Sequence, residues 1–266
     1  MDRSGKTDMK VAGIGDNVID RYMNMGIMFP GGNAVNVAAH ASRLGARAAY
    51  VGGIGADREG RIIRDALTAL NVDLSQCIFH EDSTTKKCDV NVYDGERDYI
   101  GADEGKNWAH TTRIRDCDVD YLRDFDVVHT SCNAKLHEDV HKLQDLPAMV
   151  TFDFSVKDKY RTHEFLELTC PYLELGQFSC EHMETDAIRE LMQKVYGHGC
   201  RNVVATMGAG DSFIAAVIVS LLNQGWKKGT TLTGDAVRRA LQDGASYSAE
   251  NCLRGGGFGF RNLIEE

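Results

Sequence analysis

The stretch from Thr206 to Phe213 (TMGAGDSF) combines glycines, an aspartate and the start of an apolar helix. Glycines directly before a helix let backbone N–H groups approach an anion, and the positive end of the helix dipole adds to the attraction. A carboxylate beside such a site can take the proton of a hydroxyl as its oxygen attacks phosphorus. Asp211 is therefore the predicted catalytic base, and the predicted anion hole consists of Gly208, Ala209 and Gly210. The spacing alone fits a tight turn with Asp211 as a plain N-cap equally well.

A second glycine-rich helix start lies in the N-terminal half, where residues 31–38 read GGNAVNVA. Glycines allow close backbone approach, and asparagine amides donate and accept hydrogen bonds with sugar hydroxyls. Two aspartates that follow the first predicted strand can accept hydrogen bonds from neighbouring hydroxyls. The predicted substrate-binding residues are Asp16, Asp20, Gly31, Gly32, Asn33 and Asn36.

Strand-like and helical patterns alternate around these segments. Apolar runs predict buried strands at 9–15, 49–54, 127–130, 149–154 and 202–206. Helical spacing predicts helices at 33–44, 185–196 and 212–222. Such alternation is typical of an α/β fold, a largely parallel sheet covered by helices on both faces.

One segment departs from this alternation. Apolar and polar residues alternate over 86–93, Asp94-Gly95 offers a hairpin turn, and a return strand begins at 98–100. We interpret the segment as a small flap, although an ordinary edge hairpin has the same pattern.

Composition and charge exclude several classes of function. The 266 residues, 43% of them hydrophobic, suit one large α/β domain. The formal charge of −9 and the scattered basic residues argue against nucleic acid and against an anionic membrane as partners. No apolar run is long enough to span a bilayer, and the first residues lack the apolar core of a signal peptide, so we expect a cytoplasmic protein. The eight cysteines contain no CxxC pair, which predicts reduced, mostly buried thiols and no metal site.

Taken together and in this order, the motifs resemble those of the ribokinase-like (PfkB) carbohydrate kinases, over about Lys10 to Gly257. Within that family the chain is most similar to the fructoselysine 6-kinases, on residues 15–20, 31–38, 151–155 and 206–213. The resemblance implies a ribokinase-like three-layer sandwich with a mostly parallel central sheet and a small β flap, or lid. It implies a single kinase domain over residues 1–266, with a lid formed by about 21–33 and 85–105.

The resemblance also implies an activity, the transfer of the γ-phosphoryl group of ATP to a sugar hydroxyl with Mg²⁺ on the phosphates. The implied reaction is 6-phosphorylation of fructoselysine or a related fructosamine, with the lid closing over the sugar to exclude water. The implied partners are the sugar, ATP and, through the lids, a second copy in a homodimer. The implied nucleotide-binding residues are Glu181, Gly244, Ala245 and Gly256.

The chain departs from the family in three places. The signature of the family reads DTxGAGD, but the aspartate position is Ala205 here, which leaves a monovalent cation site doubtful. The NxxE motif near the magnesium-bound phosphates is not visible, and Glu181 is the nearest acidic candidate. Relatives also carry roughly 30 residues between the preceding strand and the signature, on the long side for a βα connection, whereas here the two merge near 205–209.

Two explanations of the merged motif are open. The protein has a true deletion, which would remove one wall of the nucleotide pocket, or a loop has been left out of the sequence. We favour the second, because deleting strands from a packed core should cost more than the about 5–15 kcal/mol that stabilises a domain.

Two other functions compete with a kinase. His137, Glu138 and His141 match HExxH, which on a helix would hold zinc for a hydrolase. The loss of the aspartate at position 205 would also fit a sugar-binding pseudo-kinase with impaired catalysis. Zinc analysis would test the first alternative, and sugar titration with and without an ATP analogue would test the second.

Overall fold

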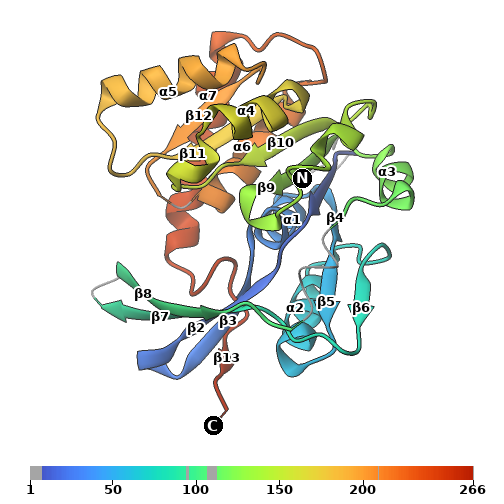
Figure 1. Ribbon diagram of the computed structural model, residues 1–266, viewed down its shortest axis with the longest axis vertical. Helices are drawn as coiled ribbons and strands as arrows, with labels where there is room; N and C mark the ends of the chain where they lie inside the picture. Colours follow the sequence, from blue (N-terminus) through green and yellow to red (C-terminus); the bar gives the residue numbers. More distant parts are fainter. Residues whose placement is uncertain (1–7, 94–95, 107–112, 209, 266) are drawn as a thin grey trace, which may run out of the picture.

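The computed structural model describes residues 8–93, 96–106, 113–208 and 210–265. Its centre is a sheet of six strands in the order β12-β11-β10-β9-β1-β4, and every neighbouring pair is parallel (Figure 1). The strands are β1 Lys10–Ile14, β4 Arg47–Val51, β9 Val127–Ser131, β10 Met149–Asp153, β11 Leu175–Ser179 and β12 Val203–Thr206. Four of them, β1, β9, β10 and β12, match predicted strands. Because both faces of the sheet are covered, the inner strands β9, β10 and β11 are almost continuously buried.

Helices cover the two faces and give the predicted three layers. On one face lie α1 Asn33–Arg43, α2 Arg58–Ala69, α6 Gly210–Asn223 and α7 Gly234–Cys252. On the other lie α3 Asp116–Leu122, α4 His163–Thr169 and α5 Thr185–Gly197. Each face has its own hydrophobic core, so alternate residues of one strand, such as Val11 and Ala12, enter different cores. The prediction of an α/β sandwich with a mostly parallel sheet is confirmed.

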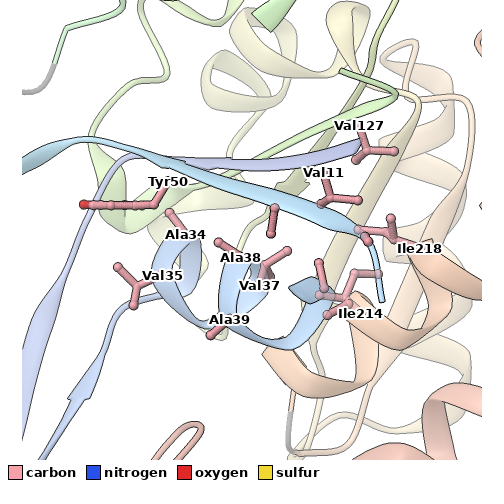
Figure 2. Close-up of a cluster of buried hydrophobic side chains, with 14 of the residues drawn as sticks. Val11, Ala34, Val35, Val37, Ala38, Ala39, Tyr50, Val127, Ile214 and Ile218 are labelled. Carbon is pink, nitrogen blue, oxygen red and sulfur yellow. The ribbon is translucent and has the colours of Figure 1, made fainter. Parts of the chain in front are cut away.

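Helices α1 and α6 pack side by side in the first of these cores. Small side chains of α1, among them Ala38, contact the sheet and α6, from which Ile214 and Ile218 point inward (Figure 2). On the sheet side, Gly13 of β1 permits the close approach, because a Cβ there would overlap the carbonyl oxygen of Ala34. The N-termini of the two helices therefore lie next to each other.

A second sheet forms the flap, which extends to one side of the central sheet (Figure 1). Its order is β13-β3-β2-β7-β8, with bounds Asn262–Leu263, Ile27–Gly31, Val18–Tyr22, Lys87–Tyr93 and Glu96–Asp103. The two segments predicted for the lid, 21–33 and 85–105, run through this sheet, which also includes β13. The predicted turn at residues 94–95 lies outside the described residues.

The predicted strand at 49–54 is wrong in its extent. The chain leaves the central sheet at Val51, and Gly53–Gly55 forms a separate strand, β5, which pairs with β6 at Ile78–His80. The break falls at Gly52, where an added Cβ would lie 2.5 Å from the carbonyl oxygen of Gly15. The Gly15 N–H donates to the Val51 carbonyl oxygen at 2.9 Å, which holds the end of β4 against the turn that follows β1.

Strand β12 is the edge of the central sheet, and α6 begins four residues after β12 ends. Residue 209, in this connection, lies outside the described residues. The prediction that a loop is missing near 205–209 stays a prediction.

All eight cysteines are free thiols. Four are buried, and Cys117 and Cys252 are exposed. No helix among the described residues has the length and apolarity to cross a bilayer.

Candidate active site

Three parallel strands end at the same edge of the central sheet and bring polar side chains together. Asp16 follows β1, Ser131 ends β9 and Asp153 ends β10. Strand β4 lies on one side of β1 and strand β9 on the other, so the direction in which the chain adds strands reverses at β1. Open α/β sheets bind ligands at such a switch point. The Ser131 hydroxyl donates to Asp16 Oδ1 at 3.2 Å, which joins the first two strands.

The N-terminus of α1 connects this edge to the predicted base. Asn33 Nδ2 lies 2.8 Å from Asp211 Oδ1 and 2.9 Å from Asp153 Oδ2, and Asn36 Nδ2 lies 2.7 Å from Asp211 Oδ2. Asn133 Nδ2 donates to Asn33 Oδ1 at 2.9 Å, which orients the Asn33 amide. Both oxygens of Asp211 therefore accept from asparagines of α1. The sequence predicted these asparagines as sugar ligands but did not predict that they hold the base.

Burial raises the pKa values of the carboxyl groups in the site. Burial, followed by the charge of Asp211, raises the pKa of Asp153 to about 7, and the same two causes raise the pKa of Asp16 to about 6. Burial also raises the pKa of Asp211, while hydrogen bonds from Asn36 and Asn33 oppose the rise. A base whose pKa lies nearer neutrality accepts a proton more readily than an ordinary aspartate.

A cleft of about 610 Å³ opens from Asp211 toward the flap. Asp20 and Arg97 line it from the flap, and Gly210, Asp211 and Ser212 line it from the start of α6. The remaining lining residues, from α1, the loop after β11 and the segment around the end of α7, are Asn36, Glu181, Asn251, Cys252, Arg254, Gly256 and Gly257. The cleft thus has one wall on the flap and one on the helical body.

The predicted anion hole lies at the start of α6, a helix of 14 residues. Gly208 has φ +126°, a backbone conformation that side chains rarely adopt, and Gly210 is the first helical residue. A Cβ on Gly210 would lie 2.6 Å from Nε2 of the buried Gln177, so this position also requires glycine. Ala209 lies outside the described residues, and its amide stays a prediction.

The predicted sugar-loop glycines lie beside the aspartates of the site. Gly32 has φ +110°, and a Cβ there would lie 2.8 Å from the carbonyl oxygen of Asp16. A Cβ on Gly31 would lie 3.3 Å from Asp20 Oδ2. These two glycines let β3 and the start of α1 pass close to the backbone of Asp16 and the carboxylate of Asp20.

The predicted nucleotide residues divide into two groups. Glu181 and Gly256 line the cleft. Gly244 instead lies between α7 and α6, where an added Cβ would be 2.8 Å from Val217, and Ala245 is exposed on α7 outside the cleft lining. Gly244 thus packs α7 on α6 in this fold, and its nucleotide-binding role stays a prediction.

Sequence reasoning missed Asp153, Asn133 and Arg97 as site residues. For Asp153 a signal was present, because a carboxylate at the end of a buried parallel strand faces the ligand edge of the sheet. Asn133 lies in a short 3-10 turn, Cys132–Ala134, with no pattern of its own. Arg97 reaches the cleft only because the flap folds back over it.

The zinc alternative is wrong. Residues 137–139 form a turn and Val140–Leu143 a 3-10 helix, so the HExxH residues do not share an α-helical face. The His137 ring packs 5.1 Å from the Phe165 ring, and Glu138 pairs with Arg113. Within the described ranges, no group of three or more His, Cys, Asp or Glu side chains could hold a metal ion.

Comparison with known proteins agrees with this geometry. The family model of the pfkB family carbohydrate kinases matches residues 13–150, which include the start of α1 and the flap strands β2, β3, β7 and β8. The chain belongs to this family. Fructosamine kinase FrlD of Bacillus subtilis is 27% identical, over 95% of this chain and 94% of that protein. Fructoselysine 6-kinase of Shigella flexneri is also 27% identical, over 90% and 96%.

Solved structures show the same fold. The structure of Arabidopsis thaliana ribokinase complexed with ribose and ATP superposes with a TM-score of 0.72 and 16% identity, covering 96% of each chain. The fold of this PfkB protein is therefore ribokinase-like, and its relatives are carbohydrate kinases.

Proposed function

We propose that this PfkB protein is an ATP-dependent kinase that phosphorylates the 6-hydroxyl of fructoselysine or a related fructosamine, with Asp211 as the base. One observation carries the proposal. Asp211 stands at the start of α6, faces the cleft and is held by Asn33 and Asn36 at 2.8 and 2.7 Å. The choice of sugar is supported by the similarity to a fructosamine kinase and a fructoselysine 6-kinase, each at 27% identity.

In the proposed reaction the sugar hydroxyl donates its proton to a carboxylate oxygen of Asp211. Each carboxylate oxygen has two lone-pair sites, so an oxygen that accepts from an asparagine can still accept from the sugar. The two asparagine donors fix the carboxylate so that its free lone pairs point at the cleft. The N–H groups at the start of α6 stabilise the negative charge of the moving phosphoryl group.

The residues of the cleft fit a Mg²⁺ ion that is bound mainly through the phosphates of the nucleotide, as in other kinases. Mg²⁺ at such sites is held by one or two carboxylates together with the phosphates, so an all-protein cage is not required. Glu181 would hold it, because this residue lines the cleft and its Oε1 lies 3.8 Å from the position of a Cβ on Gly208. When bound, the ion neutralises charge on the transferring phosphates.

ATP, a homodimer and a cytoplasmic location stay predictions. The similarity of fold to a ribokinase that was solved in complex with ATP supports the first. Ala205 has no oxygen in its side chain, so a monovalent cation site stays doubtful.

The test is a coupled ADP-release assay over fructoselysine, other fructosamines, ribose and fructose. We expect fructoselysine or another fructosamine to have the highest kcat/KM, and ³¹P–¹H NMR of the product to find phosphate on C6. The pseudo-kinase alternative predicts that a sugar binds without ATP and that no ADP forms with any sugar. That outcome, with the sugar's affinity unaffected by an ATP analogue, would overturn the kinase proposal.

A further inference from the structure

The guanidinium group of Arg97 lines the cleft from the flap and forms no bidentate pair with Asp20. It lies on β8, opposite Val92 of β7, and lines the cleft with Asp20. Its Nη1 is 3.9 Å from Asp20 Oδ2, beyond hydrogen-bond distance, and its side chain is 51% exposed. The Cζ atom lies 5.4 Å from the centre of the Tyr22 ring, an aromatic contact that holds the planar group in place.

A second arginine of the flap, Arg21, is fully paired within the sheet and serves as a comparison for Arg97. Arg21 of β2 donates to both oxygens of Asp89, at 2.6 and 2.7 Å, and so forms the bidentate pair that arginine favours. Arg97 instead pairs with Asp20 through Nη1 at 3.9 Å and contacts the Tyr22 hydroxyl. Its contact with Asp20 is not bidentate, so N–H donors of its guanidinium group remain for a carboxylate that comes from outside the chain.

The charges around Arg97 define the ligand further. Three acidic residues, Asp20, Glu181 and Asp211, line the same cleft as the two arginines Arg97 and Arg254, so its lining carries both signs of charge. A carboxylate that enters is stabilised where a guanidinium faces it. Arg97 supplies one on the flap, and Arg254, past the end of α7, supplies one on the other wall. A ligand with both an ammonium and a carboxylate group matches this mixed lining.

We propose that Arg97 forms a subsite for the carboxylate of the amino-acid portion of the substrate. The proposal rests on the proposed function, because it takes the phosphorylated hydroxyl to lie at Asp211. The sugar then occupies the cleft between Asp211 and Asp20, and the amino-acid portion extends along the flap toward Arg97. Arg97 binds the carboxylate through two parallel N–H donors, while the acidic lining attracts the secondary ammonium group of the fructosamine.

The test compares two substrates that differ only in this carboxylate. Fructoselysine and its decarboxylated analogue, fructosylcadaverine, share the sugar, the secondary amine and the carbon chain. We expect the wild-type protein to favour fructoselysine by about 10- to 100-fold in kcat/KM, mainly through KM, the value of a charge-assisted hydrogen-bonded pair. Arg97→Gln should lower kcat/KM for fructoselysine to that for fructosylcadaverine and leave the analogue unchanged. Arg97→Lys should keep part of the preference, because it retains the charge but not the fork.

Two control variants separate this role from general electrostatics. Arg64→Gln, on the exposed side of α2, makes the same change of charge away from the cleft and should behave as wild type. Arg254→Gln removes the cation on the opposite wall and should leave the ratio between the two substrates unchanged.

Several results would overturn the subsite. Equal kcat/KM of the wild type for both substrates would do so while the proposed function stands. So would an equal loss for both substrates in Arg97→Gln, or a rise in the KM for ATP, because Arg97 would then contact phosphate. If the wild type phosphorylates neither compound, the proposed function fails and the subsite fails with it.

Discussion

Asn33 is the residue on which the reactivity of the proposed base depends most specifically. Its amide donates to Asp211 and to Asp153 at 2.8 and 2.9 Å, and it accepts from Asn133. The hydrogen bond to Asp211 favours the ionised carboxylate, which is the form that accepts a proton. Asn33→Ala removes this donor and leaves Asn36 as the second one. We therefore expect the pKa of Asp211 to rise.

The size of the effect follows from the geometry. A hydrogen bond to a charged group contributes about 1.5–3 kcal/mol, and each 1.36 kcal/mol between protonation states is one pH unit. Asp211 is only partly buried, so water can replace part of the lost contact. We take the lower end and predict that the acid limb of the kcat/KM profile moves up by about one pH unit. The sign is upward, because a base with a raised pKa becomes protonated, and inactive, at higher pH.

The assay is kcat/KM for the sugar between pH 5 and 9, at saturating ATP. Asn202→Ala is the control, since it removes a side-chain amide that donates a hydrogen bond, to the Glu174 carbonyl at 2.8 Å, but at the far end of β12. The control should keep the profile of the wild type. An unchanged acid limb in Asn33→Ala, with only a higher sugar KM, would refute the reasoning and make Asn33 a sugar ligand alone.

Three further predictions test the site and its scaffold. Asp153→Asn replaces the carboxyl by a neutral group that resembles its protonated form. Burial raises the pKa of Asp153 to about 7. The protonated carboxyl therefore stabilises the folded wild-type protein at low pH, and this stabilisation is lost as pH rises through about 7. The Tm of the variant relative to the wild type should therefore increase between pH 5 and 8, and a constant difference would contradict the assignment. Gly13→Ala should lower the free energy of unfolding in urea by about 3 kcal/mol, because its Cβ would overlap the backbone of α1 at Ala34. Gly197→Ala, where a Cβ on α5 meets nothing within 4 Å, should be neutral or slightly stabilising, and equal losses in the two variants would disprove the packing argument. Asp20→Ala should raise the sugar KM by about 10- to 100-fold with kcat little changed, through lost hydroxyl contacts, and a rise in the ATP KM alone would place Asp20 on the nucleotide side.

The sequence predicts the central layers well because their signals are local. A short, mostly apolar run such as β10 predicts a buried strand, and the small apolar residues of α1 predict a helix that packs closely. The flap is harder to predict. Its strand β2 lies beside β7, about 68 residues later, and β13 comes from the other end of the chain. Such pairing is long-range, and no local pattern encodes it.

The site was predictable where a residue follows a glycine-rich turn, as Asp211, Asn33 and Asn36 do. The contacts between these residues were not, because they join positions about 175 residues apart in the sequence. Gly244 shows that one residue type can serve two purposes. A glycine at this position was predicted to contact the nucleotide, and in the fold the same glycine is required where α7 packs on Phe213 and Val217.

The central claim is that Asp211 takes the proton of the sugar hydroxyl, and Asp211→Asn tests it most directly. Sugar binding by calorimetry and single-turnover phosphoryl transfer should be measured on the same preparation. Because asparagine has nearly the same shape but is not a base, we predict sugar affinity close to that of the wild type and a transfer rate lower by about 10²–10⁴-fold. A near-normal transfer rate in Asp211→Asn would contradict the account.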